Sequence, residues 1–151
     1  MLVFEKTIIK KFWPADDKGE EDEIIRQIVV QTEARVDNSL QISELYNNMV
    51  RGLVRVVFLD NVSGDSINLP AVTIKPFNIK QKKVKIGKGD QTDYVKEEYA
   101  AITMVCRMED DSGKMLADLY PFFNFELQMQ VEEFRLSMGN SQSEDETEIS
   151  L

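Results

Sequence analysis

The sequence predicts a mainly β fold of the α+β class, an antiparallel sandwich or a partly open, OB-like barrel with one flanking α-helix at about 39–51. Most of the apolar segments alternate with a period of two, and only one segment has a helical period. Strands and helices do not alternate as they do in parallel folds. With 151 residues, 42% of them hydrophobic, the chain suits one domain. We expect that domain over residues 1–138, followed by a flexible acidic tail over residues 139–151.

Residues 2–13 and 24–36 predict two long strands. The second alternates cleanly in its later half, as expected of a half-buried strand. The residues expected to share one face of the first strand are Leu2, Phe4, Ile8 and Phe12. Those expected to share one face of the second strand are Ile24, Ile28, Val30, Ala34 and Val36.

Residues 39–51 predict the helix, because their apolar residues follow a helical spacing. The expected stripe is Ile42, Leu45, Tyr46, Met49, Val50 and Leu53. Asn38 is the predicted N-cap, and Gln41 completes a capping box three residues later. Gly52 is suited to the position that ends the helix.

The remaining elements are predicted to be strands joined by turns. The expected strands are 53–59, 66–75, 77–86, 99–109, a return strand from Lys114, and 123–131. A hairpin turn is expected over Asp110 to Gly113 and a polar loop over Gly87 to Asp93. The predicted core face of strand 99–109 comprises Ala100, Ile102, Met104, Cys106 and Met108. That of strand 123–131 comprises Phe123, Phe125, Leu127, Met129 and Val131.

Charge is distributed very unevenly along the chain. Ten of the 27 acids lie in residues 14–24 and 139–151, together with a single base, Lys18. The rest of the chain holds 17 acids and 17 bases, so the net charge of -9 comes from these two segments. Residues 75–88 hold six lysines and no acid, namely Lys75, Lys80, Lys82, Lys83, Lys85 and Lys88. A neutral body with such a cluster is able to present a locally positive surface.

Several function classes are disfavoured by composition. The chain has no histidine, which removes the commonest general base and the commonest transition-metal ligand. Its single cysteine, Cys106, forms neither an intramolecular disulfide nor a cysteine-based metal site, and is expected to be inert. No apolar run approaches the length of a membrane span, and no secretory signal is recognisable. We therefore expect a binding protein rather than an enzyme, with no cofactor, no metal and no membrane partner.

The lysine segment has three interpretations. A β-bulge near Lys82 and Lys83 would fan the lysines outward, where they would meet phosphates as point charges. In the second interpretation, the lysines protect an edge strand from aggregation or pair with the acidic loop or tail. The third is a protein partner. Phe77, between Pro76 and Asn78, is a candidate platform for stacking a base, although an ordinary core position is the simpler interpretation.

The acidic tail has three interpretations as well: a solvating end, a hook for a partner, or a competitor that covers the lysines. Over about a dozen residues it is similar, in composition alone, to the acidic tails of several phage and bacterial single-strand DNA-binding proteins. The residues expected to contact a partner are Glu144, Asp145, Glu146, Glu148, Ile149 and Leu151.

The sequence favours a single-stranded nucleic-acid-binding accessory protein with a regulatory acidic tail. The alternative is a structural assembly subunit, of the virion or injection-tube type, that self-associates through strand edges. We expect a homo-oligomer. The expected location is the cytoplasm, or the virion in the assembly interpretation. A third idea, a DNA-mimicking inhibitor, is disfavoured because the acids are concentrated in two segments.

Overall fold

A computed structural model describes residues 1–18, 24–87, 93–108 and 112–133. The described elements are β1 (Leu2–Pro14), β2 (Asp17–Lys18), β3 (Ile24–Val36), α1 (Ser39–Arg51), β4 (Leu53–Leu59), β5 (Ser66–Ile74), β6 (Asn78–Ile86), β7 (Asp93–Met108), α2 (Ser112–Leu119), the 3-10 helix η3 (Tyr120–Phe122) and β8 (Glu126–Glu133). The expected tail over 139–151 and the end of the predicted domain lie outside the described residues, as does most of the acidic loop after Asp16.

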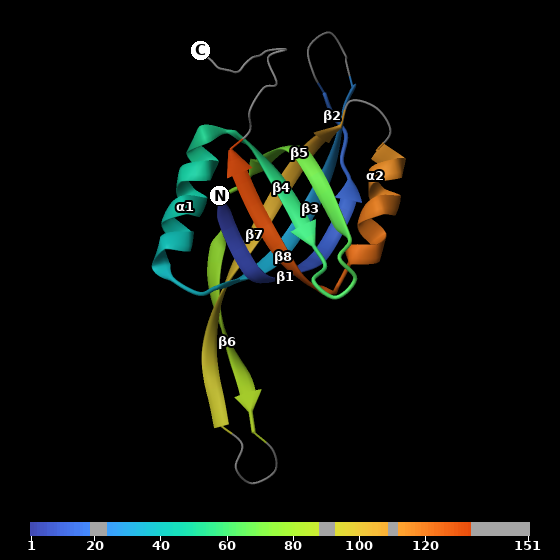
Figure 1. The fold of residues 1–151 in the computed structure, drawn as a ribbon. Helices are drawn as coiled ribbons and strands as arrows, with labels where there is room; N and C mark the ends of the chain where they lie inside the picture. The colour runs from blue at the N-terminus through green and yellow to red at the C-terminus, as the bar shows by residue number, and fades with distance from the viewer. Residues whose placement is uncertain (19–23, 88–92, 109–111, 134–151) are drawn as a thin grey trace, which may run out of the picture.

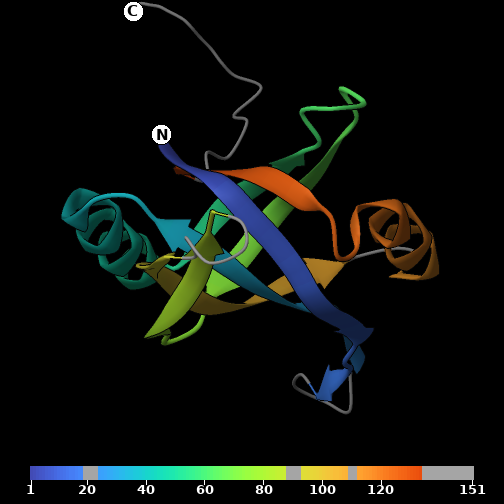
Figure 2. The same cartoon turned by 90° about the horizontal axis from the view of Figure 1, so that it is seen from below.

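The strands form one antiparallel sheet that curls into a partly closed barrel. The order is β2-β3-β1-β8-β4-β5-β7-β6, and an additional pairing of β3 with β7 links the sheet back on itself. The ring is weakest between β5 and β7, where only residues 72–74 pair with residues 104–106. Helices α1 and α2 flank opposite sides of the barrel, as Figure 1 and Figure 2 show. The predicted mainly β, antiparallel class is confirmed.

The barrel interior is apolar and follows the alternation expected for two strands. Ala100, Ile102, Met104 and Cys106 of β7 are buried, as are Leu127, Met129 and Val131 of β8. Phe123 and Phe125 were expected in the same core face, but their side chains are 37% and 58% exposed. They precede β8 in a turn, where the alternation of a strand no longer applies.

The face predicted for β1 is wrong at Ile8, whereas Phe12 packs against the core as predicted. The register against β8 shifts between Phe4 and Thr7, and the register against β3 shifts between Ile9 and Lys11. Such irregularities change which residues point inward. As a result Thr7 and Ile9 are buried, whereas Ile8 is only partly buried.

Helix α1 begins and ends where the sequence predicts. Asn38 and Gln41 form the predicted capping box, and Gly52 ends the helix with a positive φ of 93°. The buried face is nevertheless rotated, because it consists of Gln41, Leu45 and Asn48. The predicted stripe members Tyr46 and Val50 are 51% and 88% exposed.

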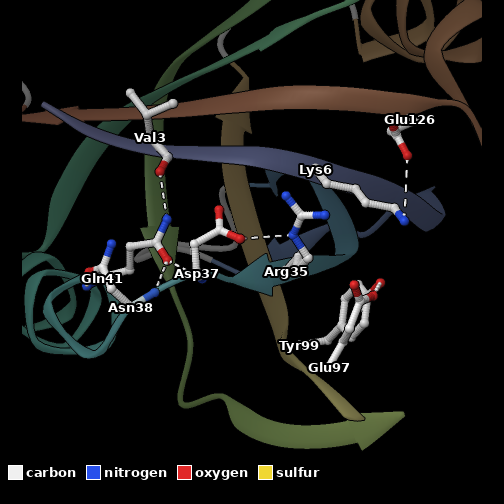
Figure 3. A network of polar contacts seen from close by, with 9 residues as sticks. All are labelled: Val3, Lys6, Arg35, Asp37, Asn38, Gln41, Glu97, Tyr99 and Glu126. Atoms are coloured by element: carbon white, nitrogen blue, oxygen red, sulfur yellow. Dashed lines mark hydrogen bonds and ion pairs between the residues drawn. The ribbon is translucent and has the colours of Figure 1, made fainter. Parts of the chain in front are cut away.

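Gln41 explains this rotation. Its amide nitrogen donates a hydrogen bond to the Val3 carbonyl at 2.9 Å, and its amide oxygen accepts from the backbone nitrogens of Asp37 and Asn38. Figure 3 shows this amide between the helix start and β1. A polar residue that both caps the helix and holds it against the barrel therefore takes a position that the apolar pattern assigned to solvent.

The expected return strand from Lys114 is wrong, since the chain there forms a second helix, α2. Met115, Leu116 and Leu119 pack against the core, a spacing that suits one helical face. Pro121 lies in η3, directly after the helix. Of the predicted hairpin turn over Asp110 to Gly113, residues 110 and 111 lie outside the described residues, and Ser112 and Gly113 belong to α2 instead. In the part of the chain that is described, no helix is long and apolar enough to cross a membrane.

Candidate interaction site on the β6–β7 arm

The lysine segment lies on a two-stranded ribbon that projects from the barrel (Figure 1). We call residues 78–86 of β6 and 93–98 of β7 the arm. Strand β7 begins at Asp93, earlier than the expected strand 99–109, and pairs with β6 from Ile86↔Asp93 to Asn78↔Ala101. That register has no shift, so the bulge expected at Lys82 and Lys83 is wrong.

Both edges of the arm lack a strand partner among the described residues. Strand β3 pairs with β7 only as far as Glu98, so residues 93–97 have an open edge on that side. On the other side, β6 is the last strand in the sheet order. Open edges present unpaired backbone donors and acceptors, which are a template for another strand.

Cross-strand pairing sorts the arm's side chains onto two faces, because directly opposite residues point to the same side. The ion-pair face holds Lys80, Lys82, Val84 and Ile86 with Asp93, Val95, Glu97 and the adjoining Tyr99. The lysine face holds Ile79, Gln81, Lys83 and Lys85 with Tyr94, Lys96 and Glu98.

On the ion-pair face, two lysines meet an acid of the barrel. Glu33 of β3 forms salt bridges with Lys80, at 3.6 Å, and with Lys82. A hydrogen bond from Lys82 lowers the pKa of the Glu33 carboxyl, and the charges of Lys82, Lys10 and Lys80 act in the same direction against partial burial. Two of the lysines therefore pair with one of the chain's own acids, Glu33. The expected pairing with the tail and with most of the acidic loop lies outside the described residues.

Tyr99 anchors the base of the same face. Its ring is 7% exposed, lies under the Lys82 ammonium at 4.9 Å, and its hydroxyl donates to Glu97 at 2.8 Å. Burial, together with the hydrogen bond to Glu97, raises the pKa of Tyr99 to about 12. Figure 3 shows the Tyr99 and Glu97 side chains next to each other. This cluster lies where the arm joins the barrel.

The lysine face is more open. Lys83 lies directly opposite Lys96, an arrangement in which like charges repel, and Lys85 lies opposite Tyr94, which is 64% exposed. All of these residues are exposed, as is Glu98. Among the described residues, the salt bridges of the arm involve only Lys80 and Lys82.

The arm also exposes apolar side chains near its tip and on both faces. Ile86 and Val95 are 48% and 44% exposed on the ion-pair face, and Tyr94 is exposed on the lysine face. A ribbon of two strands has no layer of its own to cover such residues.

The other predicted site residues are placed as follows. Lys75 is exposed just before the arm, and its backbone nitrogen bonds the Thr103 carbonyl. Phe77 is only 8% exposed, and its ring packs against Tyr46 with centroids 4.6 Å apart. An exposed stacking platform at Phe77 is therefore wrong, because the ring belongs to the core. Lys88 and the tail residues Glu144 to Leu151 lie outside the described residues.

Sequence reasoning missed Glu33, Lys96, Glu98 and Tyr99 as parts of this site. The sequence did contain a signal that β7 begins earlier than predicted. Tyr94, Lys96 and Glu98 are polar residues spaced two apart, as expected of an extended strand whose faces are both in water.

Other features of the described residues lie away from the arm. A hollow of about 500 Å³ beside α2 is lined in part by Asp60, Asp65 and Asp118. No group of three or more Cys, Asp or Glu side chains is placed to hold a metal ion in the described ranges. Cys106 is fully buried, and burial raises the pKa of its thiol. Comparisons with protein-family models, with curated proteins and with solved structures find no match.

Proposed function

We propose that this protein is a structural assembly subunit, a non-enzymatic binding protein whose copies join through the arm. The observation that carries the proposal is a projecting ribbon with two open edges and exposed apolar side chains at its tip. A subunit of a virion or an injection tube is the kind of particle component that such an arm suits.

The energetic argument concerns the arm's marginal stability. A two-stranded ribbon in water buries little apolar surface and so gains little stability from it. The side chains of Ile86, Val95 and Tyr94 remain exposed to solvent. Fully burying such side chains contributes about 1.5–3 kcal/mol each. Contact with a neighbouring copy supplies that burial and also pairs the open backbone edges, which explains why the arm carries apolar residues at all.

Single-stranded nucleic acid is the second candidate ligand, and the lysine face favours it. Lys83, Lys85 and Lys96 lie there beside the exposed ring of Tyr94, a combination suited to phosphates and stacked bases. It ranks second because Lys80 and Lys82 already pair with Glu33, and because Phe77 is buried. A role of the tail in covering these lysines or recruiting partners stays a prediction.

The assembly proposal is tested by shortening the arm. Replacing residues 83–96 with Asn-Gly joins the directly opposite positions 82 and 97 through a two-residue hairpin turn. Sedimentation velocity of the full chain across a concentration series should give oligomers, and the shortened variant should remain monomeric while its barrel still unfolds in one cooperative transition.

Two sets of point variants distinguish association through the arm from non-specific association through exposed apolar side chains. The Ile86→Ser, Val95→Ser double variant should weaken assembly, whereas Val62→Ser should not, although Val62 is 98% exposed on the turn after β4. A wild-type chain that stays monomeric at all concentrations would overturn the proposal.

If that monomer binds single-stranded DNA with a salt-dependent affinity that the Lys83→Glu, Lys85→Glu double variant abolishes, nucleic-acid binding replaces assembly as the proposed function. A version truncated after Met138 then tests the tail, because tighter binding would identify it as a competitor.

A further inference from the structure

We propose that a polar hollow between α1 and the barrel binds a small amino acid with a cationic side chain, of the lysine type. The hollow has a volume of about 690 Å³ and is lined by residues of α1, β4, β5 and β8 together with Met1. A volume of this size is usual for a small-molecule site. None of these elements belongs to the arm, so a ligand here does not depend on assembly.

The observation that carries the proposal is the side chain of Asn48. This residue of α1 is only 4% exposed and lines the hollow. Its side-chain amide has no hydrogen-bond partner among the described residues. Buried polar groups in proteins are nearly always hydrogen-bonded. Both the donor and the acceptor of this amide are therefore available to a molecule in the hollow.

Helix α1 also places opposite charges toward the two ends of the hollow. Glu44, Asn48 and Arg51 are spaced four and three residues apart, so they share one helix face, and all three line the hollow. Glu44 and Arg51 are separated by about 10 Å along the helix axis, with Asn48 between them. Neither forms an ion pair with a described residue. A ligand with a carboxylate at one end and a cationic group at the other matches this arrangement.

The strand side of the hollow is held by an arginine that already has partners. The Arg55 Nε donates to the Asn68 side-chain oxygen at 3.0 Å, and the Arg55 guanidinium pairs with Glu132 at 3.5 Å. The charges of Arg55 and Glu132 thus offset each other.

Glu133 adds a second acid at the Arg51 end. It pairs in the sheet with Val54, which follows Arg51 by three residues, and Figure 1 shows the end of β8 beside the end of α1. Glu133 also forms no ion pair among the described residues. The Arg51 end therefore presents a guanidinium for the carboxylate of an amino acid and a carboxylate for its α-ammonium group. Glu44 is then left to meet an ammonium group on the ligand's side chain.

The test is calorimetric titration of the full-length chain with three related probes. L-lysine should bind at one site per chain. Cadaverine, which is lysine without the carboxylate, and L-norleucine, which lacks the side-chain ammonium, should each bind about tenfold more weakly or less. If L-lysine shows no binding at millimolar concentration, the hollow holds only water and the proposal is wrong.

Two variants assign the ends of the ligand. Arg51→Gln should weaken L-lysine binding by about tenfold but leave cadaverine unchanged, because cadaverine has no carboxylate for the guanidinium to bind. Glu44→Gln should weaken the binding of both probes. Both side chains are exposed, so thermal unfolding should show that the fold is retained. If L-lysine binds both variants as tightly as it binds the wild type, it binds elsewhere and the site is wrong.

The Asn48 amide gives a readout that needs no substitution. In the wild type, the side-chain amide resonances of Asn48 should shift as L-lysine saturates the protein. Asn48→Ala should weaken binding, whereas the matched control Asn47→Ala should not, because Asn47 is exposed on the same helix and does not line the hollow. Resonances of Asn48 that stay unchanged at saturation would contradict the proposal.

Discussion

Glu33 determines how two of the arm's lysines are used. Its carboxylate, with a side chain only 13% exposed, holds Lys80 and Lys82 against the barrel. Lys83 and Lys85 have the opposite parity and so point away from Glu33. Lys80 and Lys82 therefore have a structural role through Glu33, whereas Lys83 and Lys85 are available to a partner.

This assignment predicts a pH dependence of stability. The folded-state pKa of Glu33 lies below its ordinary value of 4.5, chiefly because of the hydrogen bond from Lys82. The stabilisation is therefore fully present above about pH 4.5 and is lost as the pH falls through the folded-state pKa. The difference in free energy of unfolding between wild type and Glu33→Gln, measured with urea from about pH 6 to about pH 3, should shrink toward the acid end. Lys82→Met should remove most of that dependence; a constant difference across the range contradicts the assignment.

Thr7 is the second informative residue. The register shift in β1 buries its hydroxyl, which has no hydrogen-bond partner among the described residues. Thr7→Val removes an unsatisfied buried polar atom and should raise the free energy of unfolding by about 1 kcal/mol. The matched variant is Thr32→Val, because the buried Thr32 hydroxyl donates to the Ile102 carbonyl at 3.4 Å. It should not stabilise the protein; equal effects of the two substitutions in denaturant unfolding would show that the Thr7 hydroxyl is satisfied.

Secondary-structure elements were predicted correctly where the residues that determine them lie close together in the sequence. The start of α1 was predictable because its capping box lies within four residues, Asn38 to Gln41. Its buried face was not, because Gln41 is held by the Val3 carbonyl, 38 residues away in the chain. Helix α2 was misassigned because its short apolar pattern fits a strand as easily as a helix, and only its packing on the barrel decides between them.

The arm was predictable only in part for a related reason. Its β6 half was recognised as extended, but the predicted loop ended at Asp93 and the next predicted strand began at residue 99, so residues 94–98 were left without an assignment. An apolar period of two is seen only when one face of a strand is buried. Residues 93–98 lack this pattern because both of their faces are exposed to water, apart from the partly buried Glu97. The lysines marked the site correctly as a region of interest, whereas their acid partner lies on β3 and is reached only through the sheet.

The end of α1 gives a prediction about one backbone position. Gly52 has a φ of 93°, and a Cβ added there would meet nothing within 4 Å. Any cost of Gly52→Ala therefore comes from the backbone conformation rather than from a clash, and should be about 1–2 kcal/mol in the free energy of unfolding. Val50→Ala, in the last turn of the same helix and 88% exposed, should change it by less than about 0.5 kcal/mol. If the two variants unfold alike, the helix does not end on a strained residue.

At the scale of the whole molecule, the barrel and the arm have different roles. The barrel supplies a closed apolar core, while the arm lies outside it and carries much of the basic charge of the lysine segment. The counting of charges correctly indicated a neutral body with a basic strand. The projection of that strand was not predictable, because it depends on β3 ending its pairing at Glu98 while β7 continues outward.

The central claim, that copies join through the arm, is tested most directly by hydrogen exchange at two protein concentrations. Below the assembly concentration, peptides covering residues 78–86 and 93–98 should exchange much faster than the barrel strands, since a lone ribbon is marginally stable. Above it, the same peptides should become protected by about tenfold or more while the barrel is unchanged. An increase in mass with no added protection in the arm would contradict the account.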